Sequence, residues 1–245
     1  MLLRLLFILL SLFTINTLAF CQLDHTGRSV SGPFIAKNYK VFENDKGKLV
    51  TTFDIYRRND GSVLERVFLG SPYMSFPIWQ SGTVNIDGKG EDVPCQIAYN
   101  LFTDEILCRF PDSDKETPVI PIAFSINGVP FVSLPIKFLG TTTRTYFAVF
   151  NTGTTKFLVN YRRQHETNWK SKDARDFDGE YVTVERYYIR KGSADPVEIK
   201  LTTESLLAAL PEKANQLKDR LRSKKKLTKD EVIAALAYYD TLVIE

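Results

Sequence analysis

Short apolar runs separated by turn residues restrict the fold of this chain more than any other feature of its sequence. Between Tyr39 and Lys200 these runs alternate apolar with polar residues, which is the period of a strand with one buried face. Asn127-Gly128 separates two of the runs, and this dipeptide is typical of a tight hairpin turn because both central residues need positive φ. The pattern predicts about seven strands or more, mostly antiparallel. The runs are residues 49–56, 63–69, 82–86, 93–99, 105–110, 119–126, 129–138, 145–150, 156–161, 181–190 and 196–200.

The period of the pattern changes after Leu201. Pro211 suits the first turn of a helix, and Thr228 with Glu231 forms a capping-box pattern. We expect a mainly β (α+β) protein, in which residues 39–201 form an antiparallel sandwich, a curled sheet or a barrel. A helical hairpin is expected to pack on this domain over residues 202–245. Its helices are predicted at residues 204–210, 211–223 and 228–242.

Residues 1–21 have the layout of a secretory signal peptide. A charged start precedes an apolar run over residues 5–18, and Ala19 and Cys21 are small residues at the −3 and −1 positions of a cleavage site. Cleavage there would leave Gln22 as the N-terminus of a periplasmic or secreted protein. The run is shorter than the roughly 20 apolar residues of a membrane-spanning helix, and no other segment comes close, so we expect no transmembrane segment in the mature chain.

A second interpretation of the same segment is a lipoprotein signal. Leu18-Ala19-Phe20-Cys21 resembles a bacterial lipobox, in which Cys21 is acylated and becomes the first residue. The large Phe20 stands where that motif needs a small residue, so anchoring through Cys21 is the weaker alternative. Residues 22–38 contain Gly32-Pro33 and are expected to form a flexible lead-in.

Cys95 and Cys108 remain in the mature chain, and an even number of cysteines in an exported protein favours a disulfide. Each lies on the apolar side of an alternating run. If the hairpin turns at residues 100–103 and pairs Tyr99 with Asp104, Cys95 lies directly opposite Cys108. The alternative is that both are small buried hydrophobic residues without a bond.

Composition places the chain among ordinary globular proteins. Apolar residues make up 44% of it and charged residues 25%, which argues against wholesale disorder. The formal net charge is only +3, so charge does not favour a nucleic-acid partner, and export makes such a partner less expected still.

Several aromatic and turn motifs resemble a recurring pattern of small exported proteins of Bacteroidetes. The likeness covers much of the mature chain and implies an exported, β-rich protein of no known activity. It transfers no catalytic residue, and it does not include Cys95 or Cys108. The motifs are Gly70-Ser-Pro-Tyr73, Trp79-Gln-Ser-Gly82-Thr-Val84, Tyr99-Asn-Leu-Phe-Thr-Asp-Glu-Ile106 and Leu236-Ala-Tyr-Tyr239.

The sequence offers little conventional catalytic chemistry. Of its two histidines, His25 lies in the lead-in, where a catalytic base would be poorly held. The residues around His165 are typical of a loop, and the sequence lacks the second histidine that a zinc-peptidase helix needs. The sequence contains no nucleophile elbow, phosphate-binding loop or zinc-spaced Cys/His cluster. We therefore expect no catalytic, cofactor-binding or metal-binding residues and no cofactor.

An acidic stretch near Gly179 can be aligned with a calcium-binding loop. The alignment puts Asp176, Asp178 and Glu185 on ligand positions, but Ala174 occupies the first position, which needs a carboxylate. A solvated acidic turn is therefore the expectation.

A basic cluster near the C-terminus has two interpretations. It is the solvated face of a helix and its loop, or a contact site for anionic lipid. The adjacent pairs Tyr187-Tyr188 and Tyr238-Tyr239 are ligand platforms or, more commonly, packing residues. The basic residues are Lys218, Arg220, Arg222, Lys224, Lys225, Lys226 and Lys229.

These features favour an exported protein of the cell envelope with a non-enzymatic binding or structural role. The alternative is a secreted hydrolase with a carboxylate-based site that no motif marks. The partners considered are an envelope protein, a glycan and an anionic lipid surface. An enzyme predicts converging, desolvated acidic or basic groups in its pocket, whereas a binding or structural protein predicts an apolar groove or an exposed sheet edge.

Overall fold

One large curled sheet with helices on one side forms this protein, which confirms the mainly β fold class and the helical C-terminus. The computed structural model describes residues 34–57, 60–88, 90–113, 115–138, 141–151, 153–166, 177–221 and 224–243. The strands are β1 (Phe34–Glu43), β2 (Leu49–Arg57), β3 (Val63–Leu69), β4 (Gln80–Asn85), β5 (Val93–Asn100), β6 (Glu105–Arg109), β7 (Thr117–Val119), β8 (Ala123–Ile126), β9 (Val129–Phe138), β10 (Thr141–Val149), β11 (Thr155–Glu166), β12 (Gly179–Lys191) and β13 (Val197–Ile199). The helices are α2 (Thr203–Ala209), the 3-10 turn η2 (Pro211–Lys213), α3 (Ala214–Leu221) and α4 (Lys229–Val243).

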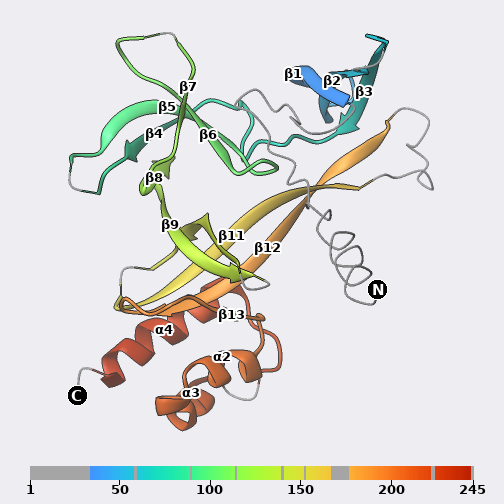
Figure 1. The fold of residues 1–245 in the computed structure, drawn as a ribbon. Coiled ribbons are helices and arrows are strands. Elements are labelled where there is room, and N and C mark those ends of the chain that lie inside the picture. Colours follow the sequence, from blue (N-terminus) through green and yellow to red (C-terminus); the bar gives the residue numbers. More distant parts are fainter. Residues whose placement is uncertain are drawn as a thin grey trace, which may run out of the picture.

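The long hairpin of β11 and β12 joins the other parts of the molecule (Figure 1). All 13 strands belong to one sheet with the order β1-β2-β3-β12-β11-β10-β9-β8-β4-β5-β6-β7, and β13 also pairs with β12. Strands β1–β3 lie at one end of the long hairpin and the helices lie below the other end, while β4–β8 form a separate lobe. Neighbouring strands are antiparallel except β3 and β12, which pair in parallel at Phe68–Leu69.

The predicted Asn-Gly hairpin is present between β8 and β9. Asn127 and Gly128 have φ angles of 49° and 79°, and Ile126 pairs with Val129 across the turn. The single strand predicted over 119–126 is instead divided into β7 and β8, since Pro121 has no N–H for a ladder hydrogen bond.

Two further predictions about β-structure need correction. Strand β1 begins at Phe34, where it pairs with Arg57, so the predicted lead-in ends earlier than residue 38. His165 lies in β11 and pairs with Tyr181 of β12, so it is a strand residue and not a loop residue. In both cases the pairing partner is distant in sequence and local turn signals did not show it.

The register predicted for the β5–β6 hairpin is wrong by two residues. Tyr99 pairs with Ile106 and Ile97 with Cys108, because the loop is residues 101–104 and not 100–103. The Asn100 side-chain oxygen accepts hydrogen bonds from the N–H groups of Phe102 and Thr103, which closes an Asx-type turn. An even shift leaves every side chain on its predicted face.

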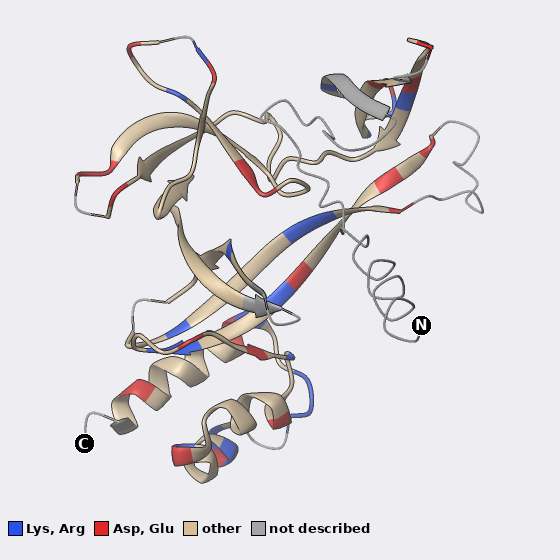
Figure 2. Ribbon diagram, in the orientation of Figure 1, with Lys and Arg blue, Asp and Glu red and all other residues tan. Residues whose placement is uncertain are grey.

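The helices follow the predicted pattern. The capping box at the start of α4 is reciprocal: Thr228 N–H donates to Glu231 Oε2 at 2.9 Å, and Glu231 N–H donates to Thr228 Oγ1 at 3.2 Å. The loop Lys224–Lys226 is exposed, as predicted, and appears as the basic segment beside α2 in Figure 2. None of the described helices combines the length and apolar character needed to cross a membrane.

The helices bury a large apolar face against β11 and β12. Leu236 and Val232 of α4 are fully buried in the same cluster as Leu217 of α3 and Phe157 of β11. A separate cluster inside the β4–β8 lobe includes Ile97, Tyr99, Ile106, Phe124 and Phe131.

A charged side chain fixes the start of α4 on the sheet. The Lys229 ammonium lies 2.7 Å from Glu185 Oε2 and within 5.4 Å and 5.7 Å of the Tyr161 and Tyr187 ring centroids. Tyr187 also donates its hydroxyl to Glu185 at 2.6 Å. Burial alone would raise the pKa of Glu185, but the hydrogen bonds from Lys229 and Tyr187 lower it below its usual value.

We expect Leu236→Ala to lower the free energy of unfolding by about 2–5 kcal/mol, because the leucine is fully buried and leaves a cavity. The exposed Lys225→Ala should change it by less than about 0.5 kcal/mol. Chemical denaturation measures both values, and the opposite ranking would show that the helices do not pack as described.

The ion pair between Glu185 and Lys229 should make the free energy of unfolding depend on pH in the acidic range. Because the folded-state pKa is lowered, the stabilisation is present above the unfolded pKa of about 4.3 and is lost as pH falls through the folded value. The difference in unfolding free energy between the wild type and Glu185→Gln should therefore shrink below about pH 4.3. The exposed Glu43→Gln is the control, and a difference that does not change with pH would contradict the ion pair.

Candidate functional site

A pocket of about 350 Å3 lies between β6–β7 and β9–β10, and we call it the sheet pocket. Its polar lining comes from Asp104, Glu105, Ser133, Arg144 and Tyr146. Its apolar lining consists of Ile106, Leu107, Pro118, Val119 and Ile120. A concave site with mostly apolar walls and a few converging polar groups is typical of small-ligand binding.

Two hydrogen bonds hold the side chain of Arg144 against β9, and they use only part of its guanidinium group. Its Nε donates to Ser133 Oγ at 3.2 Å and its Nη2 donates to the Ser133 carbonyl at 2.8 Å. No carboxylate of a described residue forms an ion pair with it. The remaining N–H groups of Arg144 are therefore positioned donors at the pocket.

Tyr146 brings a phenol to the same pocket. The residue is only 7% exposed, yet its hydroxyl forms no hydrogen bond with any described residue. Burial, together with the charge of Asp104, raises the pKa of Tyr146 to about 12. The hydroxyl therefore stays protonated at neutral pH and can both donate and accept a hydrogen bond.

Asp104 lines the pocket and accepts hydrogen bonds from three protein side chains. Its Oδ1 accepts from the Tyr99 hydroxyl at 2.6 Å, and its Oδ2 accepts from Thr145 Oγ1 at 2.9 Å and from Arg162 Nη2 at 2.8 Å. The residue is held at a φ of 63°, a conformation that a non-glycine residue rarely adopts. These contacts connect the β5–β6 loop with β10 and β11.

A second set of hydrogen bonds supports this network. Asn160 of β11 is buried and donates its amide to Thr145 Oγ1 at 3.2 Å and to the Tyr146 carbonyl at 2.9 Å. Arg162 also donates to Thr145 Oγ1. Both lone pairs and the proton of the Thr145 hydroxyl are thus used, so this part of the network is fully satisfied.

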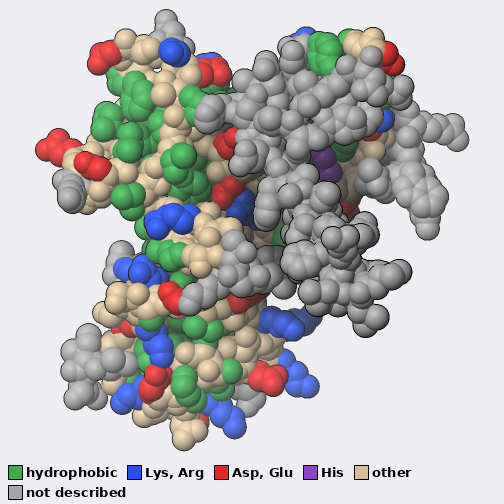
Figure 3. All heavy atoms as spheres, in the orientation of Figure 1, with side chains coloured by type: hydrophobic (Ala, Val, Ile, Leu, Met, Phe, Trp, Pro, Cys, Tyr) green, Lys and Arg blue, Asp and Glu red, His purple; other side chains and the backbone are tan. Residues whose placement is uncertain are grey.

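The outer rim of the pocket is apolar and exposed. Ile120 is 85% exposed, and Pro118 of the edge strand β7 lacks the N–H that an added strand would need. Figure 3 shows further apolar side chains on the surface of the β4–β8 lobe, and the exposed ones include Ile86, Val93 and Ile122. Pro118 therefore disfavours the addition of a strand at β7, and the pocket lies beside this edge.

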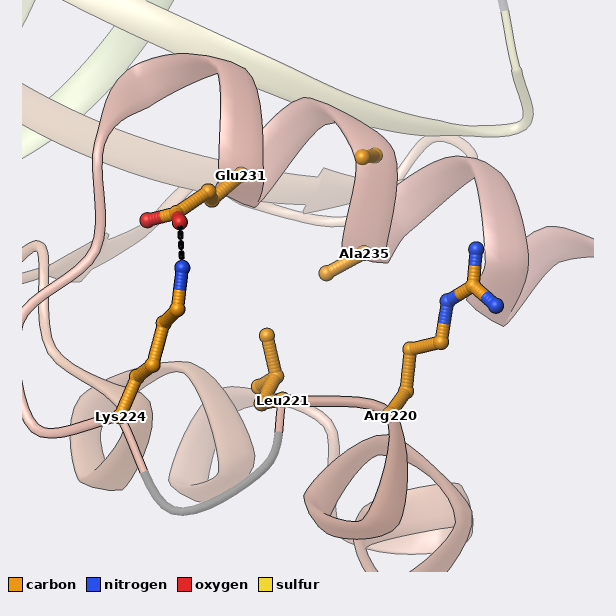
Figure 4. Close-up of a pocket in the computed structure, with 6 residues that line it drawn as sticks. Arg220, Leu221, Lys224, Glu231 and Ala235 are labelled. Carbon is orange, nitrogen blue, oxygen red and sulfur yellow. Dashed lines mark hydrogen bonds and ion pairs between the residues drawn. The ribbon is translucent and has the colours of Figure 1, made fainter.

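A smaller pocket of about 290 Å3 lies between α3 and α4, and we call it the helical groove. Figure 4 shows Arg220 and Lys224 reaching toward α4 on either side of Leu221. Glu231 pairs with Lys224, and small residues of α4, Ala234 and Ala235, complete the lining.

Cys95 and Cys108 lie close together but not as predicted. Their sulfur atoms are 3.5 Å apart, both side chains are buried, and both thiols are free. Ile97, not Cys95, lies directly opposite Cys108, so the cysteines are diagonal neighbours. Burial raises the pKa of both thiols, which makes them poor nucleophiles. The disulfide stays a prediction.

His165 serves as a packing residue. Its ring stacks between Phe68 and Phe102 at centroid distances of 4.5 Å and 4.2 Å, and Tyr181 lies edge-on at 4.4 Å. Burial lowers the pKa of His165, so the ring is neutral at physiological pH. His25 and Cys21 lie outside the described residues.

The described part of the acidic stretch contacts other parts of the protein. Asp178 forms an ion pair with Arg66 at 2.6 Å and accepts from Val67 N–H at 2.8 Å, while Glu185 holds Lys229. Within the described ranges no group of three or more His, Cys, Asp or Glu side chains could hold a metal ion. Asp176 and Ala174 lie outside those ranges.

The basic cluster is divided among different contacts. Lys229 is bound to the sheet and Lys224 is paired with Glu231, while Lys218, Lys225 and Lys226 are exposed. Arg222 is outside the described residues. The paired tyrosines are packing residues: Tyr187 stacks with Phe157, Tyr188 contacts Phe147 edge-on, and Tyr239 is buried in the helical core.

Sequence reasoning missed Arg144, Tyr146 and Asp104 as site residues. Arg144 lies just before the strand predicted over residues 145–150, whereas β10 begins at Thr141 and places Arg144 and Tyr146 two residues apart on one strand. The Asp104–Arg162 pair had no local signal, because the two residues are 58 positions apart and the β5–β6 hairpin, whose loop contains Asp104, is not a neighbour of β11 in the sheet.

Comparison with known proteins found no relative of this chain. No protein-family model matches the chain, and no curated protein or solved structure shows significant similarity to it.

Two tyrosines of the site should respond differently to removal of the hydroxyl. Tyr99→Phe leaves Oδ1 of the partly buried Asp104 without its donor and should cost about 1.5–3 kcal/mol of unfolding free energy. Tyr146→Phe breaks no hydrogen bond to a described residue and should cost less than about 0.5 kcal/mol. Denaturant titration compares the two variants, and equal losses would contradict the network.

Proposed function

We propose that this chain is an exported, non-enzymatic binding protein whose ligand site is the sheet pocket. The observation that carries the proposal is the hydroxyl of Tyr146: the residue lines the pocket, and its hydroxyl has no hydrogen-bond partner among the described residues. The hydroxyl is therefore free to donate a hydrogen bond to a bound ligand and to accept one from it. The apolar leader over residues 5–18 supports export.

A neutral saccharide is the ligand that fits the chemistry of this pocket best. The charges of Asp104 and Glu105 are balanced by those of Arg144 and of Arg162 behind the pocket, so the site attracts neither an anion nor a cation strongly. Sugar hydroxyls donate to carboxylates and accept from guanidinium and phenol groups, as this lining requires. The apolar wall can cover the C–H face of a sugar ring.

The arrangement of the carboxylates favours binding over hydrolysis. A general acid or base must exchange a proton with the substrate, but both oxygens of Asp104 are already occupied by Tyr99, Thr145 and Arg162. Glu105 accepts from Thr103 Oγ1 at 2.7 Å. The pocket therefore does not present two carboxylates that are free to act on either side of a glycosidic bond.

The test is calorimetric titration of the purified protein with glucose, galactose and N-acetylglucosamine, each compared with glucuronate and glucosamine. At least one neutral sugar should bind, and Tyr146→Phe should weaken its binding about ten-fold, which is the loss of about 1.4 kcal/mol. Lys40→Gln on the distant strand β1 is the control and should bind like the wild type.

Two results would overturn this proposal. If none of the neutral sugars bound, or if a charged sugar bound more tightly, the ligand class would be wrong. If an oligosaccharide were cleaved and Asp104→Asn abolished the cleavage, the protein would be a hydrolase.

A further inference from the structure

The helical groove carries a binding site that is separate from the sheet pocket. We infer that it binds a monoanionic amphiphile, with a carboxylate head at Arg220 and an acyl chain along the groove between α3 and α4. This inference does not depend on the proposed function, because the two pockets share no residue.

The charge balance of the groove selects a single negative charge. Lys224 forms an ion pair with Glu231, whose other oxygen accepts from Thr228 N–H at 2.9 Å, so these two charges cancel. Arg220 has no carboxylate partner among the described residues. Among the described lining residues one uncompensated positive charge therefore remains, and it stands at the end of the groove opposite Lys224 (Figure 4).

The position of Arg220 suits a planar head group. Its guanidinium lies 5.3 Å from the Tyr238 ring centroid, and this contact restrains the side chain beside α4. A restrained guanidinium offers two parallel N–H groups that match the two oxygens of a carboxylate. A fatty-acid carboxylate fits this geometry.

The floor of the groove suits an alkyl chain of moderate length. Leu221 is 7% exposed, and Ala234 and Ala235 leave space where larger residues would close the contact between α3 and α4. A cavity of roughly 150 Å3 holds benzene, which has six heavy atoms. The groove, with a volume of about 290 Å3, is about twice that size, so a ligand of about a dozen heavy atoms, such as decanoate, fits it.

The test is isothermal titration calorimetry of the purified protein with sodium decanoate below its micelle concentration. Decanoate should bind at one site, while decanol and decyltrimethylammonium should bind at least about ten-fold more weakly, because they lack the carboxylate. Arg220→Gln should weaken decanoate binding about ten-fold. The matched control is Lys218→Gln on the same helix, which removes an exposed charge outside the groove and should leave affinity unchanged.

A second variant tests the position of the chain. Ala234 is exposed, so Ala234→Leu should keep the fold while filling the groove, and decanoate binding should fall at least about ten-fold. Circular dichroism verifies that the helices of this variant remain. Absence of decanoate binding, equal binding of decanol, equal loss in Lys218→Gln or unchanged binding in Ala234→Leu would each overturn the inference. Saccharide binding is measured separately, so neither result decides the other.

Discussion

The carboxylate of Asp104 is the contact on which the central part of this structure depends. It accepts hydrogen bonds from Tyr99, Thr145 and Arg162, which belong to three different strands. Strands β10 and β11 are neighbours in the sheet, but β4, β8 and β9 separate β5 from both of them. The carboxylate therefore fastens the curled sheet across its concave side. Loss of one donor would leave an oxygen of this partly buried carboxylate with fewer hydrogen bonds, which costs free energy.

Ion pairs within the protein explain why the two pockets have different chemistry. In the sheet pocket, Asp104 uses the charge of Arg162 and leaves Arg144 and Tyr146 available to a neutral, hydrogen-bonding ligand. In the helical groove, Glu231 neutralises Lys224 and leaves one cation above an apolar floor. In each pocket the ion pairs already formed within the protein determine which charge is left for a ligand.

The elements set by local chemistry could be predicted from the sequence. The Asn127-Gly128 turn needs positive φ, and the capping box of Thr228 and Glu231 needs only a spacing of three residues, so both were predicted correctly. The β5–β6 register was missed because it depends on the side chain of Asn100 and on Asp104 at positive φ. The sheet pocket was missed because its residues meet only after distant strands pair.

Amide hydrogen exchange of the Asp104→Asn variant tests the role of this carboxylate most directly. If Asp104 fastens the sheet, exchange should accelerate both in the β5–β6 hairpin and in β10–β11, while the amides of α4 and β2 keep their wild-type rates. Faster exchange confined to the β5–β6 loop, or unchanged exchange throughout, would contradict the account. In either case Asp104 would be a local turn residue.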